Sequence, residues 1–131
     1  SNVSKEIRKN NYLNTAAALL QQSIHEMIIF TEKLKGRKET AMGLAGIGDL
    51  YVSADGGRNS KMGQYLGQGM TFQEAKKIKM ANDTVEGADL ALEIGSRVKN
   101  DFDIEKLPLM VSVIDTICDE KPLTIEWNNF K

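Results

Sequence analysis

The sequence predicts an all-α fold, a compact domain of about six to eight helices. Three observations lead to this prediction. Apolar residues recur at helical spacing, helix-starting signals stand at several points, and no run alternates apolar and polar residues as a strand would. With 131 residues, of which 41% are hydrophobic, the chain is long enough to bury one core, so we expect a single domain over residues 1–131.

The first long helix is expected over residues 13–34, at the centre of the domain. Apolar residues recur there at the spacing of one helical face: Leu13, Ala17, Leu20, Ile24, Met27 or Ile28, and Leu34. Gly36 is expected to close the helix, because glycine adopts the left-handed conformation common at helix C-termini.

Later helices carry their own starting signals. Thr71 and Glu74 have the spacing of a capping box and predict a short helix through about Lys79. Asp83–Thr84 is expected to start another helix. Its predicted apolar face is formed by Val85, Ala88, Ala91 or Leu92, Ile94 and Val98.

Two prolines frame the last main helix. Pro108 fits a first helical turn, where the N–H that proline lacks would have no partner in any case. Pro122 is expected to end that element, and residues 124–130 can form a final turn or two.

Charge and apolar runs exclude several classes of protein. The chain has 17 basic and 18 acidic residues, a net charge of -1, which disfavours general nucleic-acid binding. Its apolar runs are far shorter than the roughly 20 residues that a membrane span needs. Cys118 is the only cysteine, and we expect a buried thiol in a reducing cytoplasm.

The middle third of the chain is rich in glycine, which indicates tight turns or close approach of the backbone to a ligand. The glycines are Gly43, Gly46, Gly48, Gly56, Gly57, Gly63, Gly67 and Gly69. Glycines leading into a helix allow backbone N–H groups to face an anion, and Arg58 adds a planar guanidinium that suits phosphate. The alternative for Arg58 is an ion pair with Asp55 or a nearby carboxylate.

Asp49, within an apolar stretch, is expected to be partly buried, either as a helix N-cap or as a carboxylate that orients a cation or a substrate hydroxyl.

Several segments resemble a known family. Residues 42–50, Met-Gly-Leu-Ala-Gly-Ile-Gly-Asp-Leu, closely resemble the Gly-Leu-Ala-Gly-Leu-Gly-Asp-Leu segment of NAD(P)-dependent glycerol-3-phosphate dehydrogenases. A further family-like segment lies upstream at residues 14–19, and others follow in order at residues 57–59, 63–69, 85–87 and 107–109. The resemblance covers about residues 11–127 and implies the helical C-terminal domain typical of the 6-phosphogluconate dehydrogenase superfamily.

The family reaction is reversible hydride transfer between glycerol 3-phosphate and NAD or NADP, which gives dihydroxyacetone phosphate. The cofactor is bound mainly by an N-terminal Rossmann domain. We expect that domain to be absent from this chain, because no hydrophobic strand precedes the glycines of residues 43–48. The family's general base is a lysine in a Lys-Asn pair. Lys9–Asn10 has these letters but lies too close to Asn14, so we interpret it as a coincidence and expect the chain alone to be inactive.

The resemblance assigns roles to particular residues. Arg58 would hold the substrate phosphate and touch the cofactor, and Asn59 would hydrogen-bond the substrate. Gly57, often serine in bacterial members, would offer its backbone N–H. Asp49 would lie beside the catalytic lysine and the substrate hydroxyl, and Ser53 would retain a hydroxyl where many members have threonine. We expect Asp49, Ser53, Arg58 and Asn59 to converge on one concave face.

Glu86, with Thr84 nearby, would approach the cofactor from the border of that face. It is also explained as a first-turn glutamate favoured by the helix dipole. No Cys, His and carboxylate residues stand at metal-ligand spacing, so no metal is expected.

The expected partners are the substrate, the protein's own Rossmann domain and a possible second copy in a homodimer. The family resemblance also implies a place in phospholipid biosynthesis and carbohydrate metabolism. Two alternatives remain open. One is a catalytically inert helical binding or dimerisation module of the same fold, and the other is a dehydrogenase for another phosphorylated or acidic hydroxy compound.

Overall fold

The computed structural model describes residues 12–130, and this part of the chain contains seven α-helices and no strand. The predicted all-α class is therefore confirmed. The Lys9–Asn10 pair lies outside the described residues. The helices are α2 (Leu13–Lys33), α3 (Lys38–Met42), α4 (Asp49–Asp55), α5 (Arg58–Gly67), α6 (Phe72–Glu74), α7 (Glu86–Asp101) and α8 (Pro108–Cys118). Two π-helical turns, η1 (Leu44–Gly48) and η2 (Ala75–Lys79), and two 3-10 turns, η3 (Ile104–Lys106) and η4 (Trp127–Asn129), complete the order.

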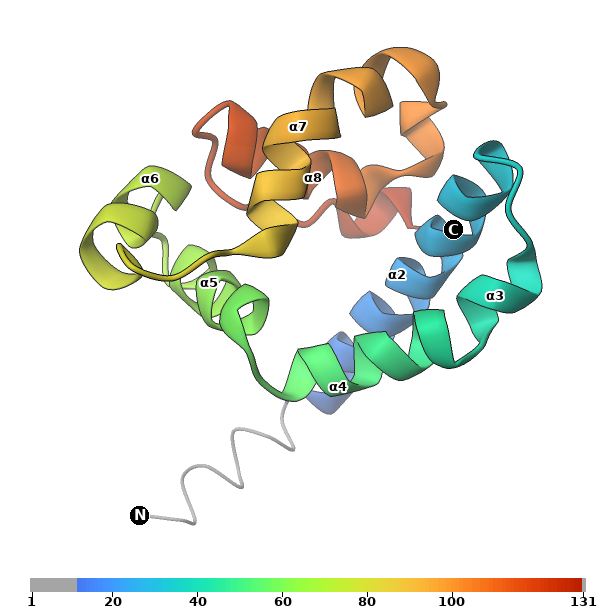
Figure 1. Cartoon of the computed structure of the whole chain (residues 1–131), viewed down its shortest axis with the longest axis horizontal. Helices are drawn as coiled ribbons and strands as arrows, with labels where there is room; N and C mark the ends of the chain where they lie inside the picture. Colours follow the sequence, from blue (N-terminus) through green and yellow to red (C-terminus); the bar gives the residue numbers. More distant parts are fainter. Residues whose placement is uncertain (1–11, 131) are drawn as a thin grey trace.

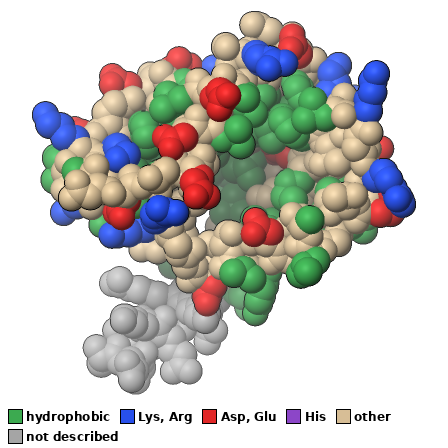
Figure 2. Space-filling model, viewed as in Figure 1, with side chains coloured by type: hydrophobic (Ala, Val, Ile, Leu, Met, Phe, Trp, Pro, Cys, Tyr) green, Lys and Arg blue, Asp and Glu red, His purple; other side chains and the backbone are tan. Residues whose placement is uncertain are grey.

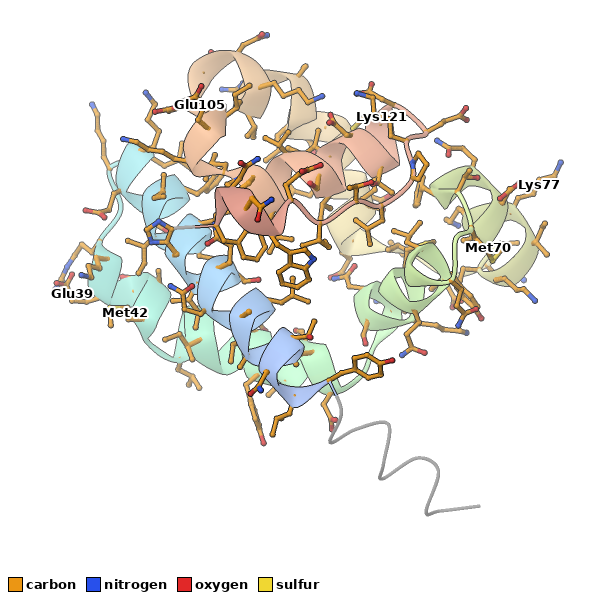
Figure 3. The ribbon with its side chains drawn as sticks, turned by 180° about the vertical axis from the view of Figure 1, so that it is seen from behind. Glu39, Met42, Met70, Lys77, Glu105 and Lys121 are labelled. Atoms are coloured by element: carbon orange, nitrogen blue, oxygen red, sulfur yellow. The ribbon has the colours of Figure 1, made fainter. Side chains whose placement is uncertain are left out.

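In Figure 1, α3, η1 and α4 run along one edge, α7 and α8 lie along the opposite edge, and α5 and α6 close one end. Seen from behind, Glu39 and Met42 of α3 lie at the far end of the molecule from Met70 and Lys77 (Figure 3). This arrangement leaves the junction between α4 and α5 beside the start of α7.

The core consists of two groups of buried apolar side chains. The first joins α5, α6, η2, α7 and α8 through Met62, Leu66, Phe72, Ala75, Met80, Val85, Ala88, Ala91 and Ile117. The second joins α7, α8 and the end of α2 through Val98, Leu107 and Ile114, with Ile29 and Phe30 packed against them. Gly95 permits the contact between α7 and α8, since a Cβ there would lie 2.8 Å from Cγ2 of Ile114.

The predicted buried face of α2 is wrong. Leu13 is 63% exposed and Leu20 41% exposed, whereas the buried side chains of the helix are Gln22 and Glu26. The reason is that the first backbone N–H groups of α8 need an acceptor, and its N-cap residue Leu107 provides no side-chain hydrogen bond to them. The Glu26 carboxylate supplies that cap from α2 and turns this polar face of α2 inward.

The ends of the helices follow local signals in part. Thr71 and Glu74 form the predicted capping box, and Pro108 lies in the first turn of α8 as predicted. The helix expected from Asp83–Thr84 begins only at Glu86, and its N-cap residue is Val85.

The C-terminus of α2 also differs from the prediction. Lys35, with φ 63°, adopts the left-handed conformation that was expected of Gly36. Gly36 instead donates its backbone N–H to the carbonyl oxygen of Thr31 at 2.8 Å. A Cβ on Gly36 would lie 2.7 Å from Cγ2 of Thr31, so close approach is what requires glycine here.

A charged group ties α7 to α8 near the surface. The Lys99 ammonium donates to Asp115 and, at 3.1 Å, to Asp119. The hydrogen bond to Asp115 raises the pKa of Lys99, and partial burial opposes this.

Within residues 12–130, no helix has the length and apolar content needed to cross a membrane.

Candidate functional site

The site begins at a glycine turn between α4 and α5. α4 ends at Asp55, and α5 begins at Arg58 after Gly56 and Gly57. Gly57 has φ 98° and ψ 178°, a backbone conformation that is essentially restricted to glycine. The Ser60 hydroxyl donates to the carbonyl oxygen of Ala54 at 3.4 Å and links the two helices across this turn. The turn therefore brings the start of α5 back beside the end of α4.

The preceding glycine segment sets the position of α4. Gly46 is buried in η1, and a Cβ there would lie 1.8 Å from the carbonyl oxygen of Ala41. Only glycine allows the π-helical turn to pass this close to α3. η1 then continues directly into α4, so the backbone has no break at Asp49.

Both expectations for the local environment of Asp49 need correction. Its side chain is exposed rather than partly buried, because Ile47 and Leu50 take the half-buried positions of this segment. It is not the N-cap, since Gly48 occupies that position and the helical backbone runs through it without a side-chain cap. Asp49 is therefore an exposed carboxylate in the first turn of α4.

Two adjoining pockets form around the α4–α5 turn. The first, of about 380 Å³, lies between α2, η1, α4 and α5, and its lining includes Met27, Gly46, Asp49, Ser53, Asn59 and Ser60. The second, of about 210 Å³, is lined by Ser53, Gly56, Gly57, Arg58, Asn59 and Glu86. Ser53 and Asn59 line both pockets, so they connect Asp49 on one side with Arg58 on the other. Figure 2 shows this face of the molecule hollowed between α4 and the α7–α8 pair, with hydrophobic side chains on its walls.

Two contacts connect the starts of α5 and α7. Nη2 of Arg58 lies 3.4 Å from Oε1 of Glu86, and both side chains are well exposed, at 51% and 76%. In the next residue pair, Oδ1 of Asn59 accepts from the backbone N–H of Gly87 at 3.0 Å. The carboxylate partner of Arg58 is therefore Glu86 and not Asp55. An exposed pair of this kind is weak, and an anionic ligand can replace it.

Thr84 is the candidate residue that the structure leaves apart. Its side chain is exposed, and it is not among the residues that line either pocket. The first pocket is also lined by two residues that were not predicted as site residues, Met27 of α2 and Ser60 of α5. Neither carries a motif, and only the helix packing brings them to the pocket. Among residues 12–130, no three His, Cys, Asp or Glu side chains are grouped to hold a metal ion.

The structure shows an all-helical domain with an arginine, an asparagine and a serine around a glycine turn. Residues 7–126 match the family described as NAD-dependent glycerol-3-phosphate dehydrogenase C-terminus. Since this match spans most of its length, the chain belongs to that family.

Curated relatives agree with this assignment. The chain is 34% identical over 112 residues to glycerol-3-phosphate dehydrogenase [NAD(P)+] of Agathobacter rectalis, covering 83% of this chain and 32% of the relative. It is 36% identical over 102 residues to NADP(+)-dependent glycerol-3-phosphate dehydrogenase of Archaeoglobus fulgidus, covering 73% and 30%. The chain thus spans about a third of the length of these relatives. No solved structure matches it.

Proposed function

We propose that this chain is the substrate-binding part of a glycerol-3-phosphate dehydrogenase, which interconverts glycerol 3-phosphate and dihydroxyacetone phosphate. The observation that carries the proposal is the position of Arg58. Its guanidinium lies at the rim of a pocket beside Ser53 and Asn59, and its partner is an exposed carboxylate. A planar, permanently charged group suits a phosphate through two parallel hydrogen bonds.

The other pocket residues complete a binding arrangement. In the proposal, the backbone N–H of Gly57 and the side chain of Asn59 hydrogen-bond the substrate, and the Ser53 hydroxyl adds a polar contact. Asp49, exposed at the far side of Ser53 and Asn59, faces the substrate hydroxyl and the base that removes its proton. Glu86, the first residue of α7, faces the cofactor, whereas Thr84 lies two residues earlier and outside both pockets.

The cofactor supplies the hydride acceptor, and the names of the relatives indicate NAD(P)+. Glu86 and Arg58 fit one edge of a polar, phosphate-bearing cofactor, since they offer an acceptor and a cationic donor on the same pocket rim. We propose that a Rossmann domain and the general-base lysine belong to the longer protein. The 131-residue chain, incubated with glycerol 3-phosphate and either NAD or NADP, should then produce no reduced cofactor.

The decisive experiment is steady-state kinetics on the longer protein with Arg58→Ala. Loss of a charge-assisted phosphate contact of about 1.5 to 3 kcal/mol should lower kcat/KM for glycerol 3-phosphate by roughly 10- to 150-fold. Arg58→Lys should recover only part of this, because it keeps the charge and loses the planar pair of donors. Arg97→Ala, on the exposed face of α7, is the matched control.

Unaltered kcat/KM in Arg58→Ala would show that the phosphate binds elsewhere. The same assay separates the alternatives. A higher kcat/KM for another phosphorylated or acidic hydroxy compound would reassign the substrate, and inactivity of the longer protein toward all of them would favour an inert helical module.

A further inference from the structure

A glycine outside the predicted site lies directly behind Asn59. Gly87 is the second residue of α7, and its backbone N–H donates to Oδ1 of Asn59 at 3.0 Å. Asn59 in turn lines both pockets. Gly87 therefore contacts the pocket only through this side chain.

The direction of this hydrogen bond fixes the orientation of the Asn59 carboxamide. A backbone N–H can only donate, so the atom that it meets must be the carbonyl oxygen Oδ1. The amide nitrogen Nδ2 then carries the donors of that side chain. Since Oδ1 is held by α7, Nδ2 is the part of this carboxamide that remains able to donate to another group.

The absence of a side chain at Gly87 permits this contact. A Cβ at that position would lie 3.1 Å from Oδ1, 3.4 Å from Cγ and 3.5 Å from Nδ2 of Asn59. Only Oδ1 lies closer than an ordinary van der Waals contact, so the carboxamide would have to turn or shift by a few tenths of an ångström to accommodate a Cβ. The requirement is steric, because Gly87 does not have the positive φ of Gly57.

We infer that Gly87 is a positioning residue, which orients the Asn59 carboxamide so that its Nδ2 donates hydrogen bonds to an anionic or hydroxyl-bearing ligand in the pockets. The inference rests on the proposed function for the identity of that ligand. The contact between Gly87 and Asn59 does not depend on the proposed function, because it involves only these two residues.

The test uses the 131-residue chain labelled with ¹⁵N, in which the side-chain amide resonances of Asn59 report its orientation. Gly87→Ala should shift these resonances and weaken the binding of inorganic phosphate by about three- to tenfold, because the donor is displaced. Gly63→Ala is the matched control. It also replaces a helical glycine and so gains similar helix propensity, but its Cβ would have no neighbour within 4 Å.

A second variant separates positioning from binding. In Asn59→Asp the carboxylate can still accept from Gly87, so the protection of the Gly87 amide from hydrogen exchange should persist. Phosphate binding should weaken by about tenfold or more, because the donor is lost and a negative charge is added. Retention of wild-type phosphate affinity in either Gly87→Ala or Asn59→Asp would overturn the inference.

The proposed function can fail separately. If the unsubstituted chain shows no response to phosphate, the phosphate site assigned to Arg58 is wrong. The positioning role is then decided by the Asn59 resonances alone. Resonances that move no further in Gly87→Ala than in Gly63→Ala would overturn it.

Discussion

Glu26 of α2 caps α8 from 84 residues away, since its Oε1 accepts the backbone N–H of Met110 at 2.7 Å. Its Oε2 accepts the backbone N–H of Leu109 at 2.9 Å and the side-chain amide of Gln22 at 2.8 Å. The side chain is 2% exposed. A negative charge at the start of a helix is stabilised by the helix dipole as well as by these donors.

Glu26→Ala should therefore lower the free energy of unfolding by on the order of 3 kcal/mol, since buried donors lose a charged acceptor. Glu26→Gln should lower it by less, because one amide oxygen can still accept. Urea denaturation followed by circular dichroism measures both effects. Glu32→Ala, an exposed glutamate of the same helix, should change the free energy by less than about 0.5 kcal/mol. Equal effects of Glu26→Ala and Glu32→Ala would contradict the capping role.

The second prediction concerns the turn between α4 and α5. Gly57→Ser should destabilise this protein by about 1 to 3 kcal/mol, because φ 98° with ψ 178° strains any side chain. Gly56→Ser is the control, since Gly56 has an extended φ of -178° and open space around it. In thermal unfolding, the midpoint temperature should fall for Gly57→Ser and stay near the wild-type value for Gly56→Ser. A serine that is tolerated equally at both positions would mean that the turn readily adopts another conformation.

The third prediction concerns alkaline pH. The pKa of Lys99 is raised above its ordinary value of 10.5, mainly by its hydrogen bond to Asp115, so the folded state holds the proton more tightly than the unfolded state. The stabilisation is fully present below pH 10.5 and is lost as the pH rises through the raised folded-state pKa. The difference in free energy of unfolding between wild type and Lys99→Met should thus be constant near neutral pH and shrink in alkali. Lys106→Met, which removes an exposed pair with Asp103, should show a small difference throughout. If the difference in free energy of unfolding between wild type and Lys99→Met does not shrink in alkali, the ion pair of Lys99 does not stabilise the fold in this way.

The fourth prediction concerns the carboxylate beside Arg58. Glu86→Gln should tighten the binding of inorganic phosphate to the 131-residue chain by up to about fivefold, because an exposed ion pair of 0.2 to 1 kcal/mol no longer competes for the guanidinium. Isothermal titration at low salt would detect this, and the gain should decrease as salt is added. Glu93→Gln, exposed further along α7, changes the net charge equally and serves as the control. Equal gains in the two variants would attribute the effect to net charge alone.

Features determined by neighbours in the sequence could be predicted. The capping box of Thr71 and Glu74 and the proline start of α8 depend on a few adjacent residues, and both were predicted correctly. The all-α class depends on periodicity within each segment, and it too was predicted. The same holds for much of the buried face of α7, whose spacing was regular from Val85 to Val98.

Features determined by distant residues could not be predicted. The buried face of α2 depends on the unpaired amides of α8, so its apolar spacing pointed the wrong way. Asp49 is exposed because Ile47 and Leu50 take the half-buried positions of this segment, and the sequence alone does not show which side of η1 and α4 faces the rest of the molecule. Gly87 stood in a family-like segment, but its contact with Asn59 depends on α7 beginning beside α5, which the sequence does not show.

The glycine-rich segment at residues 43–48 will also show unequal tolerance to mutation. Position 46 is closed to every other amino acid, because even an alanine Cβ would overlap the carbonyl oxygen of Ala41. At position 48 the nearest atom is the end of the Leu44 side chain, which is exposed and free to turn away. In a library that samples all substitutions, Gly46 should therefore remain invariant among folded variants while Gly48 accepts small residues. The two glycines look alike in the sequence, but only the first is required by the path of the backbone.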